Sequence, residues 1–189
     1  TVNYDAYAGF QKTTNKVKMA NAQEYATFTN ELAGLNGGAP VFSDPSTLGQ
    51  GTDWYDQILR NGFVTNHNLS VAGGGEKSTY NISLGFLDQD GNVKTNNYKR
   101  YTARVSNDIQ VFKDLKVGYN VTGLSSKSRD IPTTIYHQLY GAAPSVPVFN
   151  ADGSYGDPKT QNLGDGANYN PQASIDFFNQ QTKQYSITG

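Results

Sequence analysis

Residues 67–88 read HNLSVAGGGEKSTYNISLGFLD, with apolar and polar residues alternating on both sides of a glycine-rich turn. The same period of two returns in residues 98–109 and 114–125. The apolar set comprises Leu69, Val71, Tyr80, Ile82, Leu84, Phe86, Tyr101, Ala103, Val105, Leu115, Val117, Tyr119 and Val121. Because successive side chains of a strand point to opposite faces, the pattern predicts strands that each have one apolar and one polar face.

Two classes of protein use such two-faced strands. A water-soluble β-sandwich buries the apolar face under a second sheet, whereas a membrane β-barrel turns it outward to lipid, around a polar lumen. The first class would make this chain a secreted soluble β-domain that binds carbohydrate, and the second a piece of a transmembrane barrel. The two classes differ in the surroundings of one set of side chains, which a barrel exposes to lipid and a sandwich buries under a second sheet. The set is Leu69, Leu84, Val105, Val117 and Val121.

The composition of the 189-residue chain suits a barrel and also suits a sugar-binding β-protein. Only 36% of the residues are hydrophobic and 16% are charged, while the chain contains 20 Gly, 13 Tyr and 9 Phe. Low charge with many aromatic residues is typical of a barrel that has a hydrophilic interior and aromatic girdles at the two membrane interfaces. The net charge of −1 gives no reason to expect nucleic acid as a partner, and the absence of Cys excludes disulfides and zinc–thiolate sites.

The segments outside these strands follow a clear asymmetry. Strands are expected near residues 1–14, 66–74, 78–88, 98–109, 114–125 and 184–189. Short helices are expected within the connections, at 20–33, 53–60 and 136–140. The turns at 73–77 and 111–114 are short, and the remaining connections, 15–65, 89–97 and 126–183, are long. If the first strand runs outward, every long connection falls on the outer side, as in an outer-membrane barrel.

Several strings, taken in order, resemble one known family. They are VNYDAYAGFQ at 2–11, TDWYDQILR at 52–60, HNLSVAGG at 67–74, SLGFLDQDG at 83–91 and PVFNADGSYG at 147–156. Their order and spacing resemble the SusC/RagA type of TonB-dependent outer-membrane transporter of Bacteroidota. The similarity runs, with gaps, over nearly all of the chain. Both ends of the chain fall inside strand-like patterns, so we expect residues 1–189 to be part of a longer protein.

This resemblance implies an all-β fold: an antiparallel transmembrane β-barrel segment with long extracellular loops that carry short helices. The segment would supply the first five to six strands, just after the plug, of a barrel of about 22 strands. The whole protein would sit in the outer membrane of a Gram-negative bacterium and import large nutrients, glycans or oligopeptides, with energy relayed through TonB. The implied partners are a SusD-like surface lipoprotein that acts as a lid, TonB through a preceding region, the nutrient and outer-membrane lipid.

Catalytic motifs find little support in the sequence. His67 and His137 are the only histidines and lie seventy positions apart. The pairs Asp53/Asp56 and Asp88/Asp90 are explained by helix starts and turns. Residues 73–78 lack the Gly that a phosphate-binding loop places directly before its Lys. We therefore expect a protein that is not an enzyme.

Binding is expected in the outer loops. Residues 88–92 and 150–154 partly match a calcium loop, which leaves loosely bound calcium as an open alternative. No other cofactor is expected. Aromatic rings stack on sugar faces or peptide side chains, and the alternative is that the rings pack loop against loop. The candidates for contact with substrate or lid are Trp54, Tyr136, Tyr140, Phe149, Tyr155 and Tyr169, and packing is the favoured role for Trp54.

Overall fold

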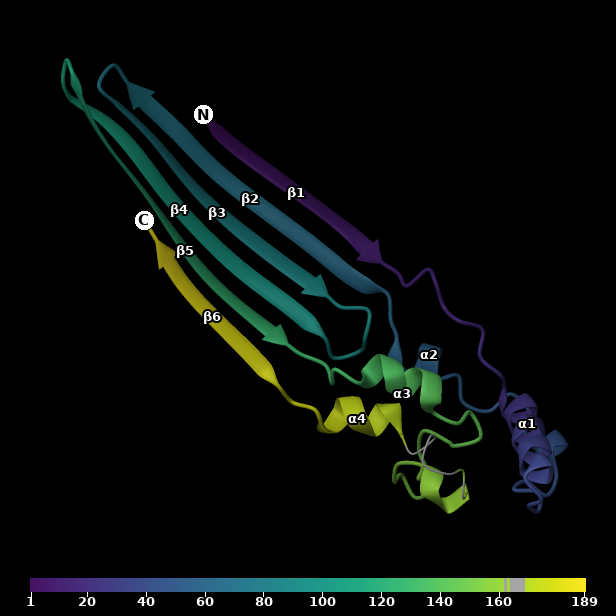
Figure 1. Cartoon of the computed structure of the whole chain (residues 1–189). Helices are drawn as coiled ribbons and strands as arrows, with labels where there is room; N and C mark the ends of the chain where they lie inside the picture. The colour runs from purple at the N-terminus through teal and green to yellow at the C-terminus, as the bar shows by residue number, and fades with distance from the viewer. Residues whose placement is uncertain (162, 164–168) are drawn as a thin grey trace. The chain divides into compact units, whose positions relative to one another are not determined.

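The computed structural model describes residues 1–161, 163 and 169–189 and contains one six-stranded antiparallel sheet (Figure 1). The strands lie side by side in the order in which they occur along the chain. They are β1 (Val2–Gln11), β2 (Gly62–Gly75), β3 (Ser78–Asp90), β4 (Asn97–Phe112), β5 (Leu115–Arg129) and β6 (Gln181–Thr188). The expected antiparallel meander of six strands is thus confirmed.

The chain divides into two compact units. The sheet unit comprises Thr1–Lys12, Asn61–Asp130 and Gln180–Gly189, and the loop unit comprises Thr13–Arg60 and Ile131–Asn179. The loop unit contains the α-helices α1 (Ala22–Leu35), α2 (Trp54–Ile58), α3 (Ile135–Gly141) and α4 (Pro171–Phe177), and the 3-10 helices η1 (Pro45–Leu48) and η2 (Pro158–Gln161). Among the described residues, no helix has both the length and the apolar composition needed to cross a membrane.

The strand register sorts the side chains onto two faces. Residues directly opposite one another on neighbouring strands share a face of the sheet. One such row reads Tyr4, Leu69, Leu84, Ala103, Gly123 and Ile187 from β1 to β6. The neighbouring row, on the other face, reads Asn3, Ser70, Ser83, Arg104, Thr122 and Thr188. We call these the apolar face and the polar face of the sheet.

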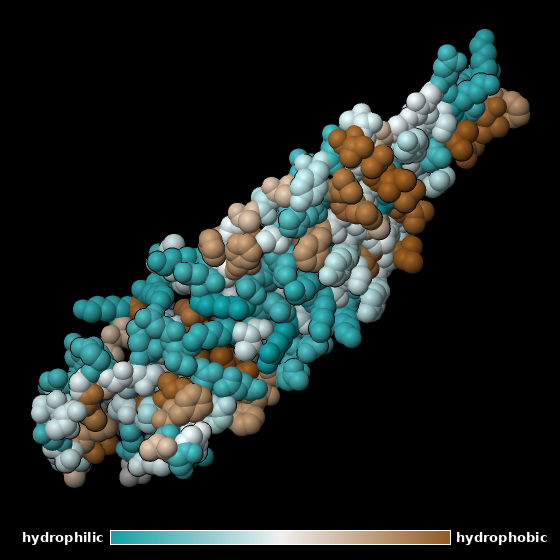
Figure 2. All heavy atoms as spheres, turned by 180° about the vertical axis from the view of Figure 1, so that it is seen from behind, coloured by the Kyte–Doolittle hydropathy of each residue, from teal (hydrophilic) through white to brown (hydrophobic). Residues whose placement is uncertain are grey.

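No second sheet covers the apolar face in the part of the chain that the structure describes. Leu84 is 53% exposed, and Leu69, Val105, Val117 and Val121 are exposed too. Figure 2 shows hydrophobic residues gathered over the sheet near the end that carries the two tight turns. The soluble carbohydrate-binding domain requires these side chains to be buried under a facing sheet, and the described residues do not supply that sheet.

The apolar face changes character along the strands. Rows of aliphatic residues end at an aromatic row that contains His67, Phe86, Tyr101 and Tyr185, with Ser125 between the two tyrosines. The next row, toward the long connections, is charged and contains Asp88, Lys99, Lys127 and Lys183. From Tyr101 to Ile109 the apolar part of β4 spans nine residues, or about 26 Å along the strand. Tilted barrel strands cross a membrane in about 9–11 residues, so this length suits a membrane-spanning strand.

Strands β2 to β6 run further toward the long connections than the hydrophobic pattern indicates, whereas β1, expected near 1–14, ends at Gln11. β5 was expected near 114–125 and continues to Arg129, β2 begins at Gly62 rather than near 66, and β6 begins at Gln181 rather than near 184. The added part of β5 pairs in register with β4, from Arg100↔Ser126 to Asn97↔Arg129. Both faces are polar there, so pairing continues where alternation has ended.

Two helices show how local sequence fixes the loop unit. Asn21 caps α1 in a capping box, because its side chain accepts from the Glu24 amide at 2.8 Å while the Glu24 carboxylate accepts from the Asn21 amide at 3.0 Å. The helix α4 was not expected. It starts at Pro171, and the side chain of Asn170 accepts from the amides of the next turn.

Candidate functional site

The loop unit is held together by a core that joins two distant segments. The Trp54 indole donates through Nε1 to the Ala143 carbonyl at 3.0 Å, and the Thr52 hydroxyl donates to the Val146 carbonyl at 2.8 Å. A Cβ on Gly51 would lie 2.2 Å from the Pro144 carbonyl oxygen, so only glycine allows this close approach. The fully buried side chains of this core are Ile58, Ile135, Leu139, Val146, Pro171 and Ile175.

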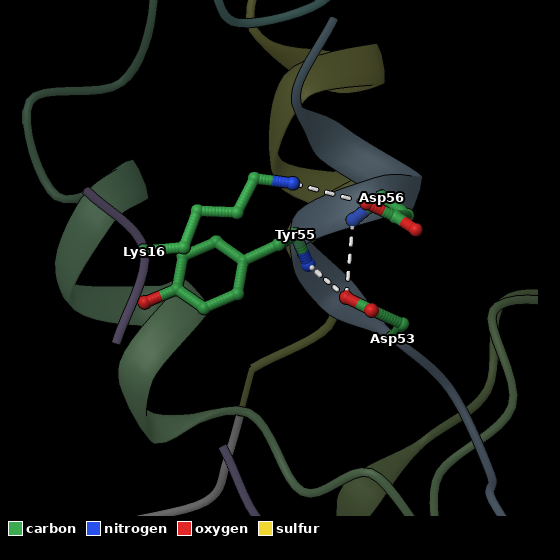
Figure 3. Close-up of polar contacts among 4 residues, drawn as sticks. All are labelled: Lys16, Asp53, Tyr55 and Asp56. Atoms are coloured by element: carbon green, nitrogen blue, oxygen red, sulfur yellow. Dashed lines mark hydrogen bonds and ion pairs between the residues drawn. The ribbon is translucent and has the colours of Figure 1, made fainter. Parts of the chain in front are cut away.

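Lys16 and three residues at the start of α2, Asp53, Tyr55 and Asp56, make polar contacts with one another (Figure 3). The Asp53 carboxylate accepts from the amides of Tyr55 at 2.9 Å and Asp56 at 3.1 Å, which caps the helix. Lys16 pairs with Asp56 at 3.0 Å, and its Nζ lies 5.9 Å from the centre of the Tyr55 ring. Asp53 and Asp56 are therefore engaged in a cap and an exposed ion pair rather than in an acid–base pair.

Tyr55 stands beside a pocket of about 330 Å³ inside the loop unit, lined by Lys16, Val17, Met19, Trp54, Tyr55 and Leu139 among others. Among the described residues, its buried hydroxyl has no hydrogen-bond partner of good geometry. Burial first, and then the neighbouring Tyr140 hydroxyl, raise the pKa of Tyr55 above its ordinary value. The Tyr55 and Tyr140 rings meet edge to face at 6.1 Å.

A second cluster presents aromatic rings to solvent. Phe149 and Tyr155 pair in a short β-bridge with ring centres 5.1 Å apart, and Phe177 lies 5.5 Å from Tyr155. We call these three residues the aromatic platform. Phe177 is 78% exposed and Phe149 is also exposed. The ring planes are tilted by 37° between Phe149 and Tyr155 and by 59° between Tyr155 and Phe177, so the platform is an uneven apolar surface that a ligand can reach.

Polar contacts fix the platform. The Tyr155 hydroxyl donates to the Asp176 carboxylate at 2.9 Å, a hydrogen bond that is the main cause of the raised pKa of Tyr155. The Gln172 amide donates to the same carboxylate at 2.8 Å. In the turn that joins Phe149 to Tyr155, the Asp152 carboxylate accepts from the hydroxyl and the amide of Ser154, and these bonds lower the pKa of Asp152. Aromatic faces and hydrogen-bonding groups thus lie together at one site.

The six aromatic residues singled out from the sequence occupy different environments. Trp54 is 4% exposed, which favours the packing role. Tyr136 and Tyr140 are exposed on α3, and Tyr169 meets His137 edge to face at 6.2 Å. Phe149 and Tyr155 come together in the aromatic platform. A role for any of them in binding substrate or lid stays a prediction.

The platform member Phe177 and the neighbouring Asp176 were missed by the sequence reasoning. Phe177 at the end of α4 and Asp176 beside it follow the Asn170-Pro171 pair, a start signal for a short helix that was available in the sequence. Among the described residues, no group of three or more His, Cys, Asp or Glu could hold a metal ion. Asp152 serves as a turn residue in the 150–154 segment that resembles a calcium loop.

Comparison with known proteins places this geometry in a class. The chain is similar to part of the solved RagAB peptide transporter, with a TM-score of 0.65 at 17% identity, covering 91% of this chain and 24% of that chain. The RagAB peptide importer in its closed-closed state gives a TM-score of 0.61 at 19% identity, covering 82% of this chain and 22% of that chain. The sheet and helices therefore have the fold of part of a TonB-dependent receptor barrel.

Curated sequences give the family. The chain is 33% identical over 160 residues to the TonB-dependent receptor SusC of Bacteroides thetaiotaomicron, and 32% identical over 155 residues to the TonB-dependent receptor P26 of Formosa agariphila. Each alignment covers 82% of this chain, which spans about 15% of the length of these relatives. No protein-family model matches. The chain belongs to the SusC/RagA type of TonB-dependent receptor, a family of Gram-negative outer-membrane transporters rather than enzymes.

Proposed function

We propose that the chain forms wall strands and outer loops of a transporter that imports a large nutrient across the outer membrane. The observation that carries the proposal is the register, which collects aliphatic side chains on one uncovered face and polar side chains on the other. In a barrel of about 22 strands, the apolar face contacts lipid and the polar face lines a plugged lumen. The long connections leave the sheet at one end, which is the outer end.

The nutrient is a glycan or an oligopeptide that the aromatic platform helps to capture. A flat ring stacks on the apolar face of a sugar or on a peptide side chain, and Asp176 and Gln172 can hydrogen-bond hydroxyl or amide groups beside it. RagAB, whose structure shares this fold at low sequence identity, is a peptide importer. That likeness supports an oligopeptide as the nutrient.

The whole protein works with two partners. A SusD-like surface lipoprotein closes over the outer loops, where the exposed rings of Tyr136 and Tyr140 are candidate contacts. TonB acts through a region that precedes the segment, and β1 follows the plug. Membership of the SusC/RagA type supports both partners and the energy coupling.

Spin labels in the full-length receptor test the orientation of the wall. Residues 1–189 contain no Cys, so single substitutions Leu84→Cys and Ser83→Cys add one labelling site each in this segment. We expect the label at 84 to be reached by oxygen dissolved in lipid and the label at 83 by a water-soluble nickel complex, because neighbouring residues lie on opposite faces. Protection of position 84 from both reagents would contradict the proposal.

A further inference from the structure

A row of lysines borders the apolar face at the end of the sheet that carries the long connections. The register places Lys99, Lys127 and Lys183 directly opposite one another on β4, β5 and β6. All three side chains are exposed. We call these residues the lysine row, and it lies one step beyond the aromatic row that contains Tyr101 and Tyr185.

The charges of this row are poorly balanced within the chain. Neighbouring strands lie about 4.8 Å apart, and like charges directly opposite one another destabilise a sheet. Lys99 binds the Asp88 carboxylate at 2.6 Å. In the part of the chain that the structure describes, neither Lys127 nor Lys183 has an ion-pair partner. Asp88 and the nearby Asp90 both act on Lys99, so the lysines left for an added anion are Lys127 and Lys183.

An apolar groove of about 620 Å³ lies beside the lysine row on the same face of the sheet. Its lining includes Leu84, Tyr101, Ala103, Gly123, Tyr185 and Ile187. Ala103 and Gly123 are opposite each other, and their small size leaves room between the larger side chains. A Cβ built on Gly123 would come no closer than 3.9 Å to any other atom, so the space above it is open.

We propose that this surface binds one phosphate-bearing, acylated lipid of the leaflet at the long-connection end of the barrel. The lysine row binds the phosphate, and the groove holds an acyl chain. A cationic edge directly above an apolar groove complements a molecule with an anionic head and hydrocarbon tails, and long lysine side chains reach from apolar surface to the headgroup level. The inference rests on the proposed function, because it requires the apolar face to lie in lipid.

Binding of fluorescent diphosphoryl lipid A to the full-length receptor in detergent tests the proposal. The double variant Lys127→Gln/Lys183→Gln is expected to bind about 25-fold more weakly, from a factor of about five for each lost lysine. Lys127→Arg/Lys183→Arg keeps the charge and should keep most of the affinity. Lys77→Gln/Lys113→Gln changes two lysines in the tight turns at the opposite end and should bind as the wild type does.

The groove is tested by Gly123→Leu, which fills it and is expected to weaken lipid binding at least tenfold with the lysines intact. Unchanged binding in Lys127→Gln/Lys183→Gln or in Gly123→Leu overturns the proposal. Equal competition by inorganic phosphate and by unlabelled lipid A also overturns it, because the site would then bind free phosphate. Failure of the proposed function is a separate outcome, since it appears as a Leu84 label shielded from lipid, whatever the lysine variants do.

Discussion

At the scale of single residues, the Trp54 indole joins two segments of the loop unit. It is 4% exposed and donates a hydrogen bond to a carbonyl 89 positions away. Replacing a buried tryptophan by alanine typically costs about 3–5 kcal/mol. We expect Trp54→Ala in the full-length receptor to make residues 13–60 and 131–179 sensitive to limited proteolysis while the sheet stays resistant.

The control for this prediction is Tyr136→Ala, since Tyr136 is 48% exposed and its loss should change the free energy of unfolding by no more than about 0.5 kcal/mol. Trp54→Phe should fall between the two variants, because it keeps most of the packing and loses the hydrogen bond. Equal protease resistance of Trp54→Ala and wild type would show that the indole has no structural role.

Tyr55 gives a residue-scale prediction with a pH dependence. Its buried hydroxyl lacks a good partner, so Tyr55→Phe should leave the free energy of unfolding unchanged or raise it by up to about 1 kcal/mol. Because the folded pKa is raised above the ordinary value of 10.0, the contribution of Tyr55 is complete below pH 10 and is lost as the pH rises through the folded pKa.

Thermal unfolding of the full-length receptor at about pH 8 and pH 11 measures this effect. The difference in unfolding temperature between the two pH values should be smaller in Tyr55→Phe than in the wild type. Tyr136→Phe, on the exposed face of α3, serves as the matched control and should retain the wild-type difference. A marked loss of stability of Tyr55→Phe at pH 8 would mean that the hydroxyl makes a bond absent from this structure.

At the scale of elements, the aromatic platform links α4 to the bridge between Phe149 and Tyr155. Stacked aromatic contacts contribute about 0.5–1.5 kcal/mol beyond area burial, so Phe177→Ala should weaken nutrient binding roughly 2- to 12-fold. Nutrient-dependent growth and direct binding to the full-length receptor measure the effect. Phe28→Ala, an exposed ring on α1, is the matched control. Equal losses in both variants would remove the platform from the proposed function.

The elements also show which parts of the fold the sequence could predict. Period-two alternation predicted the six strands, because one face of each strand is apolar where the other is polar. The alternation does not extend to the polar ends of the strands, where residues 126–129 pair through backbone hydrogen bonds that have no hydrophobic signature. Phe149 and Tyr155 were predicted as candidates from an aromatic-rich loop. The contact of Trp54 with Ala143 could not be predicted, since its acceptor is a backbone carbonyl of no particular sequence.

At the scale of the whole molecule, the sheet has two edge strands, β1 and β6. In the described residues β1 and β6 do not pair with each other. In the proposed barrel an unpaired strand edge in hydrocarbon would leave backbone groups without hydrogen bonds, so the proposed function requires further strands to pair with both edges. This requirement agrees with a chain that spans about 15% of the length of its relatives.

Within the loop unit, residues 13–60 contact residues 131–179, and these long-range contacts affect the expected order of folding. The hydrogen bonds among them connect positions separated by 89, 94 and 115 residues, whereas β2 to β5 pair across the two tight turns or across the connection 91–96. Contacts between distant positions form slowly, since a long loop must close first. In pulse-labelling hydrogen exchange during refolding, amides of β2–β5 should gain protection before those of α2 and α3. Simultaneous protection would mean that the helices assemble without waiting for their distant partners.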